Sequence, residues 1–204
     1  MQNFNNGRIK FPLQPLSLLY NDIGAKEEKI VNITVYCGAS LGNNEIFIKA
    51  AKSLGKWIAE NGHTLVYGGG NVGLMGVLAD EVLQHNGKVI GIMPTFLVER
   101  EISHPNLTHL EIVNSMSERK NKMIELGDCY IALPGGPRTL EEISEVISWA
   151  RIGQHQNPCV LYNVGGFYDK LKDLYNVMVD YGFLTETDKK AILFSDSLSE
   201  IEEF

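Results

Sequence analysis

The segment Thr64-Leu65-Val66-Tyr67-Gly68-Gly69-Gly70-Asn71-Val72-Gly73-Leu74-Met75-Gly76 joins a short apolar run to a glycine-rich turn and then to a stretch with helical periodicity. A buried strand that ends in glycine and is followed by a helix is typical of a βαβ unit. Glycines occupy the same position at Gly38 and Gly42 and at Gly135–Gly136. Ligands of doubly wound sheets bind outside the carboxyl ends of the strands, where helix N-termini attract anions. Three such turns together favour a phosphate-bearing ligand, although glycine also makes ordinary tight turns.

From Ile30 onward, short β-branched runs alternate with amphipathic stretches. The pattern predicts a doubly wound, Rossmann-like α/β fold with a mainly parallel sheet and helices on both faces, in one domain over residues 29–204. The expected strands are 31–36, 64–67, 88–92, 108–112, 129–133 and 159–162. The expected helices are 45–60, 74–84, 116–126, 140–152 and 168–181. Residues 1–28 lack this rhythm, and we expect an N-terminal arm that packs loosely or docks on a partner subunit.

Length and composition exclude several classes of protein. The 204 residues favour one domain over two, and the net charge of −7 repels a phosphate backbone, so we expect no nucleic-acid partner. The apolar stretch 11–20 contains two prolines and is too short to cross a bilayer, so we expect no membrane anchor. The three cysteines form no C-x-x-C pair, which favours a reducing, cytoplasmic location. The histidines form no H-x-x-x-H pair, and we expect no metal site.

Two glycine motifs suggest functions that their surroundings disfavour. The segment 68–73 fits G-x-G-x-x-G, but a dinucleotide site needs an acidic residue about 20 positions later, and the first acid after the next strand is Glu99. The segment 38–42 fits the G-x-S-x-G nucleophile elbow. It follows the first strand, however, and no later acid and histidine stand out as partners of Ser40. We therefore expect Ser40 in a loop that contacts phosphate or ribose.

Two helix starts carry charged residues that suggest a site. Ser115 and Glu118 form a capping box, whereas the cations Arg119 and Lys120 oppose the helix dipole unless an anionic ligand or a carboxylate offsets them. A solvated helix face is the alternative for these two cations. A second capping box is expected for a helix that starts at Thr139, with Glu142 as its acid. A fixed carboxylate beside a phosphate-binding turn suits chemistry in which positive charge develops on a sugar.

Together these segments resemble the LONELY GUY family of cytokinin nucleoside 5′-monophosphate phosphoribohydrolases, whose members are often labelled possible lysine decarboxylases. The resemblance covers about residues 30–182 and rests on 67–76, 115–120, 134–142 and 148–155, in matching order. It implies hydrolysis of the N-glycosidic bond of AMP or of a cytokinin riboside monophosphate, and a homodimer with helices 116–126 and 140–152 near the interface. We therefore expect no cofactor and a small nucleotide as the partner.

The resemblance also implies residue roles. Glu142 would stabilise the cationic transition state and orient or activate water, and Arg119 would hold the ligand and pair with Glu142. Gly135, Gly136 and Thr139 would cradle the phosphate. The remaining residues expected to contact the substrate or its phosphate are Ser40, Gly70, Asn71, Met116, Lys120, Arg138 and Glu141.

The chain departs from the family pattern P-G-G-x-G-T-x-x-E, because Arg138 replaces its last glycine, and Pro137 beside it lacks an N–H donor. Ser117 stands where the family usually has histidine. The Arg138 side chain either points into the turn, where it would pair with phosphate, or points outward and leaves the turn strained; we favour the first. Lysine decarboxylation is disfavoured. An enzyme that uses pyridoxal phosphate needs a lysine that forms a Schiff base with the cofactor, and no lysine stands at a suitable strand end. The alternative function is a nucleotide- or cofactor-binding carrier without turnover.

Overall fold

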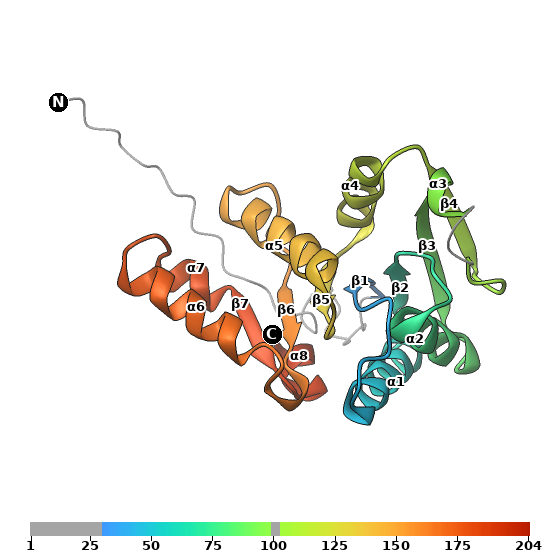
Figure 1. Cartoon of the computed structure of the whole chain (residues 1–204), viewed down its shortest axis with the longest axis horizontal. Coiled ribbons are helices and arrows are strands. Elements are labelled where there is room, and N and C mark those ends of the chain that lie inside the picture. The colour runs from blue at the N-terminus through green and yellow to red at the C-terminus, as the bar shows by residue number, and fades with distance from the viewer. Residues whose placement is uncertain (1–29, 99–102) are drawn as a thin grey trace, which may run out of the picture.

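A computed structural model describes residues 30–98 and 103–204 (Figure 1). Its sheet has seven strands in the order β4-β3-β2-β1-β5-β6-β7, and every neighbouring pair is parallel. The strands are β1 Asn32–Tyr36, β2 Thr64–Tyr67, β3 Lys88–Pro94, β4 His109–Val113, β5 Cys129–Ala132, β6 Cys159–Tyr162 and β7 Ile192–Ser195. The predicted doubly wound parallel α/β fold is confirmed. The seventh strand is an addition that the sequence pattern did not predict.

Helices connect the strands as crossovers. The long helices are α1 Glu45–Glu60, α2 Gly73–Gln84, α4 Met116–Leu126, α5 Pro137–Arg151 and α6 Asp169–Asp180, which agree with the predicted set to within three residues at either end. The short elements that were not predicted are α3 Thr95–Val98, the 3₁₀ turn η1 Val164–Gly166, α7 Glu186–Lys190 and α8 Leu198–Glu203. These are one to two turns long, so they carry too few apolar residues for a periodicity to be recognised.

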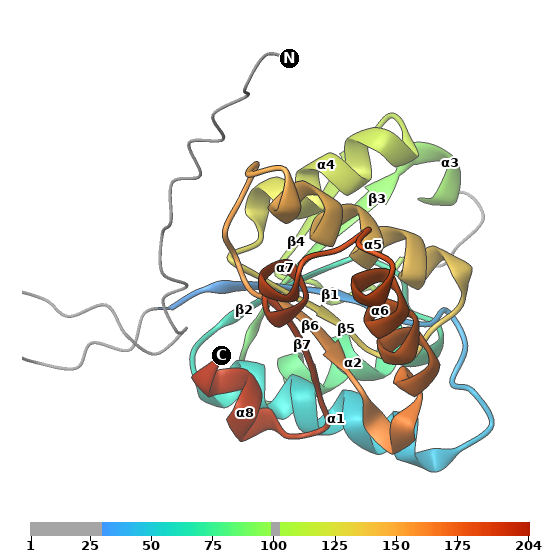
Figure 2. The same cartoon turned by 90° about the vertical axis from the view of Figure 1, so that its left-hand side faces the viewer.

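The sheet separates two helical layers. Figure 2 shows α4 and α5 on one side of the sheet and α1 and α2 on the other. Successive residues of β1 alternate between these layers: Val35 packs in the cluster with α1, α2 and α8, and Tyr36 packs in the cluster with α4, α5 and α6. Most central strand residues are buried on both faces, which explains their nearly continuous apolar sequence.

The chain order reverses at β1, which pairs with β2 on one side and with β5 on the other. In an open parallel sheet such a reversal leaves a crevice beyond the carboxyl ends of the strands. Backbone hydrogen bonds tie the segments at this crevice together: Gly38 N–H donates to the Pro134 carbonyl over 3.1 Å, and Leu74 N–H donates to the Gly38 carbonyl over 3.1 Å. The glycine turns after β1, β2 and β5 therefore meet at one edge of the sheet.

Helix α4, which carries three of the predicted site residues, is fixed at its C-terminal end by side-chain donors. Thr34 Oγ1 donates to the Met123 carbonyl over 2.9 Å, and Tyr130 Oη donates to the carbonyls of Ile124 over 2.8 Å and Gly127 over 3.0 Å. Carbonyls at a helix end lack a full set of helical partners, although Ile124 also accepts from the N–H of the C-cap Gly127 over 3.3 Å. Side chains of β1 and β5 add donors here and hold α4 on the sheet.

The predicted arm, residues 1–28, lies outside the described residues. In the part of the chain that the structure describes, no helix combines the length and the apolar character needed to span a bilayer.

Candidate active site

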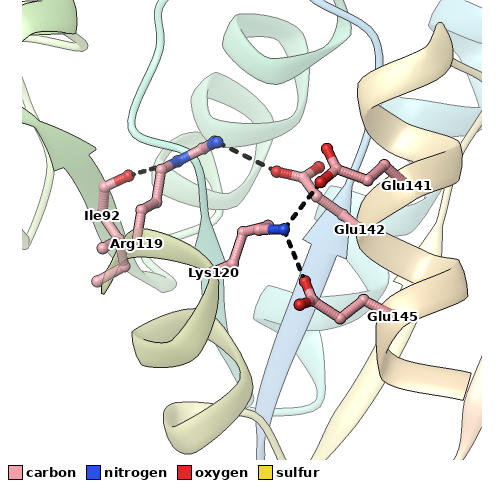
Figure 3. Close-up of polar contacts among 6 residues, drawn as sticks. All are labelled: Ile92, Arg119, Lys120, Glu141, Glu142 and Glu145. Atoms are coloured by element: carbon pink, nitrogen blue, oxygen red, sulfur yellow. Dashed lines mark hydrogen bonds and ion pairs between the residues drawn. The ribbon is translucent and has the colours of Figure 1, made fainter. Parts of the chain in front are cut away.

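Arg119 and Glu142 form a buried ion pair between α4 and α5 (Figure 3). Arg119 Nη1 lies 3.1 Å from Glu142 Oε1, and both side chains are 5% exposed. Arg119 Nε also donates to the Ile92 carbonyl, near the end of β3, over 3.0 Å. Because the guanidinium is held at two points, its orientation toward the carboxylate is fixed. The sequence predicted both residues, and the structure brings them into direct contact.

Gly68 provides the space that this guanidinium occupies. A Cβ on Gly68 would collide with Arg119 Nη2, so any other residue would displace the arginine side chain. Gly73, further along the same turn, has a φ of +61°, and a Cβ there would collide with the backbone of Ala39 and Ser40. The turn after β2 therefore needs glycine for close packing against the arginine and against the turn after β1. This requirement gives the glycine run a reason other than dinucleotide binding.

Burial is the dominant influence on the Glu142 carboxyl. It raises the pKa of Glu142 above the ordinary value of 4.5, and the charge of Arg119 opposes the rise without cancelling it. A carboxylate with a pKa nearer to neutral is a better general base for water. Burial likewise raises the pKa of the neighbouring Cys37 thiol and of the Tyr36 phenol, and the charge of Glu142 adds to both shifts. Cys37 is therefore a neutral thiol and a poor nucleophile.

Helix α5, after the glycine turn that follows β5, begins earlier than predicted. Its N-cap is Gly136 and its first residue is Pro137, so the expected start at Thr139 is wrong. The expected capping box between Thr139 and Glu142 is also wrong: among the described residues no side chain caps α5. Proline suits the first helical position, where its missing N–H would have had no helical partner. Glu142 is therefore free of a capping role and pairs with Arg119 instead.

The turn itself is tightly built. Thr139 is 3% exposed, and its side chain lies so close to Gly135 that a Cβ on Gly135 would collide with Thr139 Oγ1. Gly136, by contrast, has nothing within 4 Å of a would-be Cβ, so its outer face is open. Tyr168 Oη donates to the Leu133 carbonyl over 2.8 Å and holds the segment that leads into the turn.

Arg138 lies in the first turn of α5 and is exposed. Among the described non-glycine residues, only Asn86 has a positive φ, so the strain expected for an outward Arg138 is absent and that expectation is wrong. The charge of Arg138 lowers the pKa of Glu142, second to that of Arg119 among the cations. The arginine therefore adds positive potential at the edge of the site without distorting the turn.

Lys120, the residue after Arg119, is paired with carboxylates. Its Nζ lies 2.8 Å from Glu141 Oε1 and 3.0 Å from Glu145 Oε2 (Figure 3). These two partners raise the pKa of the Lys120 ammonium. The carboxylate partners anticipated for the two cations of this helix start are thus present. The sequence analysis missed Glu145, although its place one turn after Glu142 on the same helix face offered a signal.

The remaining predicted residues lie around the pair. Ser115 caps α4 as expected, since its Oγ accepts from Glu118 N–H over 3.1 Å, whereas Glu118 Oε2 accepts from Asn114 N–H over 2.8 Å. Met116 is half-buried one turn before Arg119. Ser40 and Asn71 are exposed on their turns, and Tyr67 Oη donates to the Gly70 carbonyl over 3.2 Å. The hydrogen bonds and ion pairs of the described residues do not join Ser40, Asn71 or Met116 to the central pair.

The described residues hold no group of three or more histidine, cysteine, aspartate or glutamate side chains that could hold a metal ion. What the site offers is a buried carboxylate, a fixed guanidinium and an open glycine turn at a helix N-terminus. This combination suits a ligand that carries an anionic group on one side and develops positive charge on the other.

Several relatives of this chain are named as cytokinin riboside 5′-monophosphate phosphoribohydrolases. The chain is 39% identical over 178 residues to the cytokinin riboside 5′-monophosphate phosphoribohydrolase LOG of Oryza sativa, covering 87% of this chain and 74% of the relative. It is 40% identical to the cytokinin riboside 5′-monophosphate phosphoribohydrolase of Rhodococcoides fascians, covering 79% of this chain and 82% of the relative. With LOG1 of Arabidopsis thaliana it shares 39% identity, with coverages of 86% and 82%.

Solved structures show the same fold at lower identity. The molybdenum cofactor binding protein of Rippkaea orientalis superimposes with a TM-score of 0.63 at 22% identity, covering 84% of this chain and 92% of that one. The molybdenum cofactor carrier protein of Chlamydomonas reinhardtii gives 0.60 at 18% identity, with coverages of 81% and 89%. The family description "Possible lysine decarboxylase" matches residues 75–203. The chain therefore belongs to the LONELY GUY (LOG) family, which carries this description.

Proposed function

We propose that this protein hydrolyses the N-glycosidic bond of a nucleoside 5′-monophosphate, AMP or a cytokinin riboside monophosphate, to free base and ribose 5-phosphate. The observation that carries the proposal is the buried Arg119–Glu142 pair at the meeting point of three glycine turns. The curated relatives named for this reaction share 37–42% identity with the chain. Residues 134–136 and Glu142 match the family motif.

The geometry suits an oxocarbenium-like transition state. As the bond between C1′ and the base breaks, its electron pair moves to the base nitrogen and positive charge develops at C1′. The Glu142 carboxylate stabilises this charge in a site with little water, where an electrostatic interaction is stronger than in solution. Water then adds to C1′, and the proton that it loses balances the one taken up by the base. Arg119 keeps the carboxylate in place and holds the ligand.

We assign the phosphate to the turn after β5. Gly135 and Gly136 bring backbone close to the ligand, and the N-terminus of α5 favours an anion. The Thr139 side chain packs against Gly135 and so helps to fix the shape of the turn. Arg138, exposed in the first turn of α5, supplies a guanidinium that compensates for the donor missing at Pro137. Ser40, Gly70, Asn71 and Met116 line the approach from the other turns and are assigned to the ribose and base side.

We further propose that the protein is a cytoplasmic homodimer with α4 and α5 near the interface, as the family resemblance implies. Met123 and Ile147, two apolar residues on these helices, belong to the core of the described chain. Leu140 and Ile152, at the two ends of α5, are 42% and 69% exposed. These exposed side chains, rather than Met123 and Ile147, are the ones available to a partner.

A cofactor carrier without turnover is less well supported. The carriers share this fold at identities of 18–22%, which is a likeness of fold alone, whereas the phosphoribohydrolases are closer in sequence over most of the chain. Incubation of the protein with AMP and with isopentenyladenosine monophosphate, followed by chromatography for free base, distinguishes the two functions. Release of base supports the enzyme, and binding without release supports the carrier.

Glu142→Gln is expected to abolish base release and leave the fold intact. The amide has the size of the carboxyl group and can still accept a hydrogen bond from Arg119, but it cannot stabilise a cation. Free base measured by chromatography, together with far-UV circular dichroism, tests this. Glu125→Gln, a change to an exposed carboxylate on α4, is the control and should retain activity. Wild-type activity in Glu142→Gln would refute the mechanism.

The stability of the wild type and that of Glu142→Gln should depend differently on pH. The pKa of Glu142 is raised in the folded protein. The contribution of this carboxyl group to folding stability is therefore fully present below the unfolded pKa of 4.5 and is lost as pH rises through the folded pKa. Glutamine does not titrate. The wild type should therefore lose stability relative to Glu142→Gln as pH rises above about 4.5. Urea unfolding of both proteins across this range measures the difference, and a difference that moved the other way would contradict burial as the dominant influence.

Arg138→Ala should weaken binding of phosphate-bearing ligands. A charge-assisted contact contributes about 1.5–3 kcal/mol, so KM for the nucleotide should rise roughly tenfold to a hundredfold. Inhibition by adenosine, which lacks the phosphate, should not change. Arg138→Gly, which restores the glycine of the family motif, should behave like the alanine variant. Faster hydrolysis in Arg138→Gly would mean that the arginine obstructs the turn.

A further inference from the structure

A second set of ion pairs joins the helices that carry the catalytic pair. Lys120 extends from α4 between Glu141 and Glu145 of α5, at 2.8 and 3.0 Å (Figure 3). The lysine side chain is 17% exposed and that of Glu145 is 28% exposed. The Lys120 side chain is thus mostly covered although Glu141 is 59% exposed, and the ammonium charge is balanced by groups of this chain.

The two sets of contacts are adjacent on both helices. Arg119 and Lys120 are consecutive on α4, and Glu142 and Glu145 are three residues apart on α5, which places them on the same helix face. A movement of α4 along or away from α5 that broke the Lys120 contacts would also pull the guanidinium from Glu142. The sheet fixes the other end of α4 through Thr34 and Tyr130. At the end nearest the site, the lysine contacts add to the hydrogen bond from Arg119 to the Ile92 carbonyl.

We propose that Lys120 and Glu145 are positioning residues, whose ion pair sets the spacing of α4 and α5 that keeps the Arg119 guanidinium on the Glu142 carboxylate. The inference rests on the proposed function. It replaces the phosphate contact expected of Lys120 from the sequence with a role inside the protein.

The charges around Lys120 argue against a phosphate contact. Moving the ammonium to a ligand would leave the carboxylates of Glu141 and Glu145, four residues apart on one helix, without their shared cation. An incoming phosphate would also approach these two carboxylates, which repel it. The N-terminus of α5 provides positive potential without this penalty.

Lys120→Met is expected to lower kcat about tenfold to a hundredfold, because small displacements of catalytic groups are costly, while KM for the nucleotide changes less than about threefold. Lys120→Arg, which can still bridge two carboxylates, should restore most of kcat. The matched control is Lys122→Met. Lys122, two residues further along α4, lies 3.6 Å from Glu111 and 3.7 Å from Glu125 and makes no bridge to α5 in the described chain. This variant should keep both constants.

Glu145→Gln separates the two roles of Lys120. If the ion pair positions the helices, kcat falls and KM stays. If the lysine binds phosphate, losing one competing carboxylate lowers KM, and Lys120→Met raises KM with kcat unchanged; either result would overturn the proposal.

A readout independent of activity distinguishes failure of this inference from failure of the proposed function. Arg119 Nε–H is buried in a hydrogen bond to the Ile92 carbonyl, so its NMR signal should exchange slowly with solvent. Exchange should accelerate at least about tenfold in Lys120→Met and Glu145→Gln but not in Lys122→Met or Lys120→Arg. Unchanged exchange in the first two variants would refute the positioning role, whether or not the wild type releases base.

Discussion

The buried ion pair between Arg119 and Glu142 is the interaction on which the site depends. Removing two charges from water is costly, and the attraction between them compensates only when their geometry is fixed and their other donors and acceptors are satisfied. The structure fixes this geometry from several sides. The Ile92 carbonyl accepts from Arg119 Nε, Gly68 leaves room for the guanidinium, and the sheet holds the far end of α4. Elements distant in the sequence thus share one constraint.

The parallel fold explains why these elements meet. Strand order reverses at β1, so the turns after β1, β2 and β5 converge at the carboxyl edge, and the helices that follow begin there. Two helix starts at this edge carry opposite charges, Arg119 on α4, which follows β4, and Glu142 on α5, which follows β5. A doubly wound sheet thereby creates an anion-binding edge and a buried carboxylate side by side, a combination that suits a phosphorylated sugar whose C1′ becomes cationic.

The alternation of apolar runs and amphipathic stretches was enough to predict six strands and five long helices, because burial on both faces of the sheet leaves a strong pattern. Strand β7 lies at the edge of the sheet, its two middle residues are only half-buried, and it follows a helix of five residues, so neither element left a strong pattern. The two helix starts show a further limit. Ser115 and Thr139 stand in the same S/T-x-x-E pattern, but Ser115 caps α4, whereas Pro137 starts α5 two residues before Thr139. The S/T-x-x-E pattern alone did not show which of the two residues is the N-cap of its helix.

Some residues of the site could likewise be predicted from the sequence, and others could not. Arg119 and Glu142 could be named from family motifs, and the convergence of the glycine turns followed from topology. The Ile92 carbonyl could not be identified, and Glu145 was marked only by its spacing from Glu142, because their roles exist only when α4, α5 and β3 are packed together. Gly68 was recognisable as part of a glycine turn, but its purpose, to accommodate a guanidinium from a helix about fifty residues later, depends on tertiary contacts.

The central claim is that positive charge develops at C1′ beside Glu142 when the base departs. The most direct test is competition between unlabelled AMP and AMP carrying deuterium at C1′, under conditions in which bond cleavage limits the rate. The account predicts that the deuterated substrate reacts more slowly, because C1′ changes from tetrahedral toward trigonal in the transition state. Equal rates for the two substrates, or no free base from either, would contradict it.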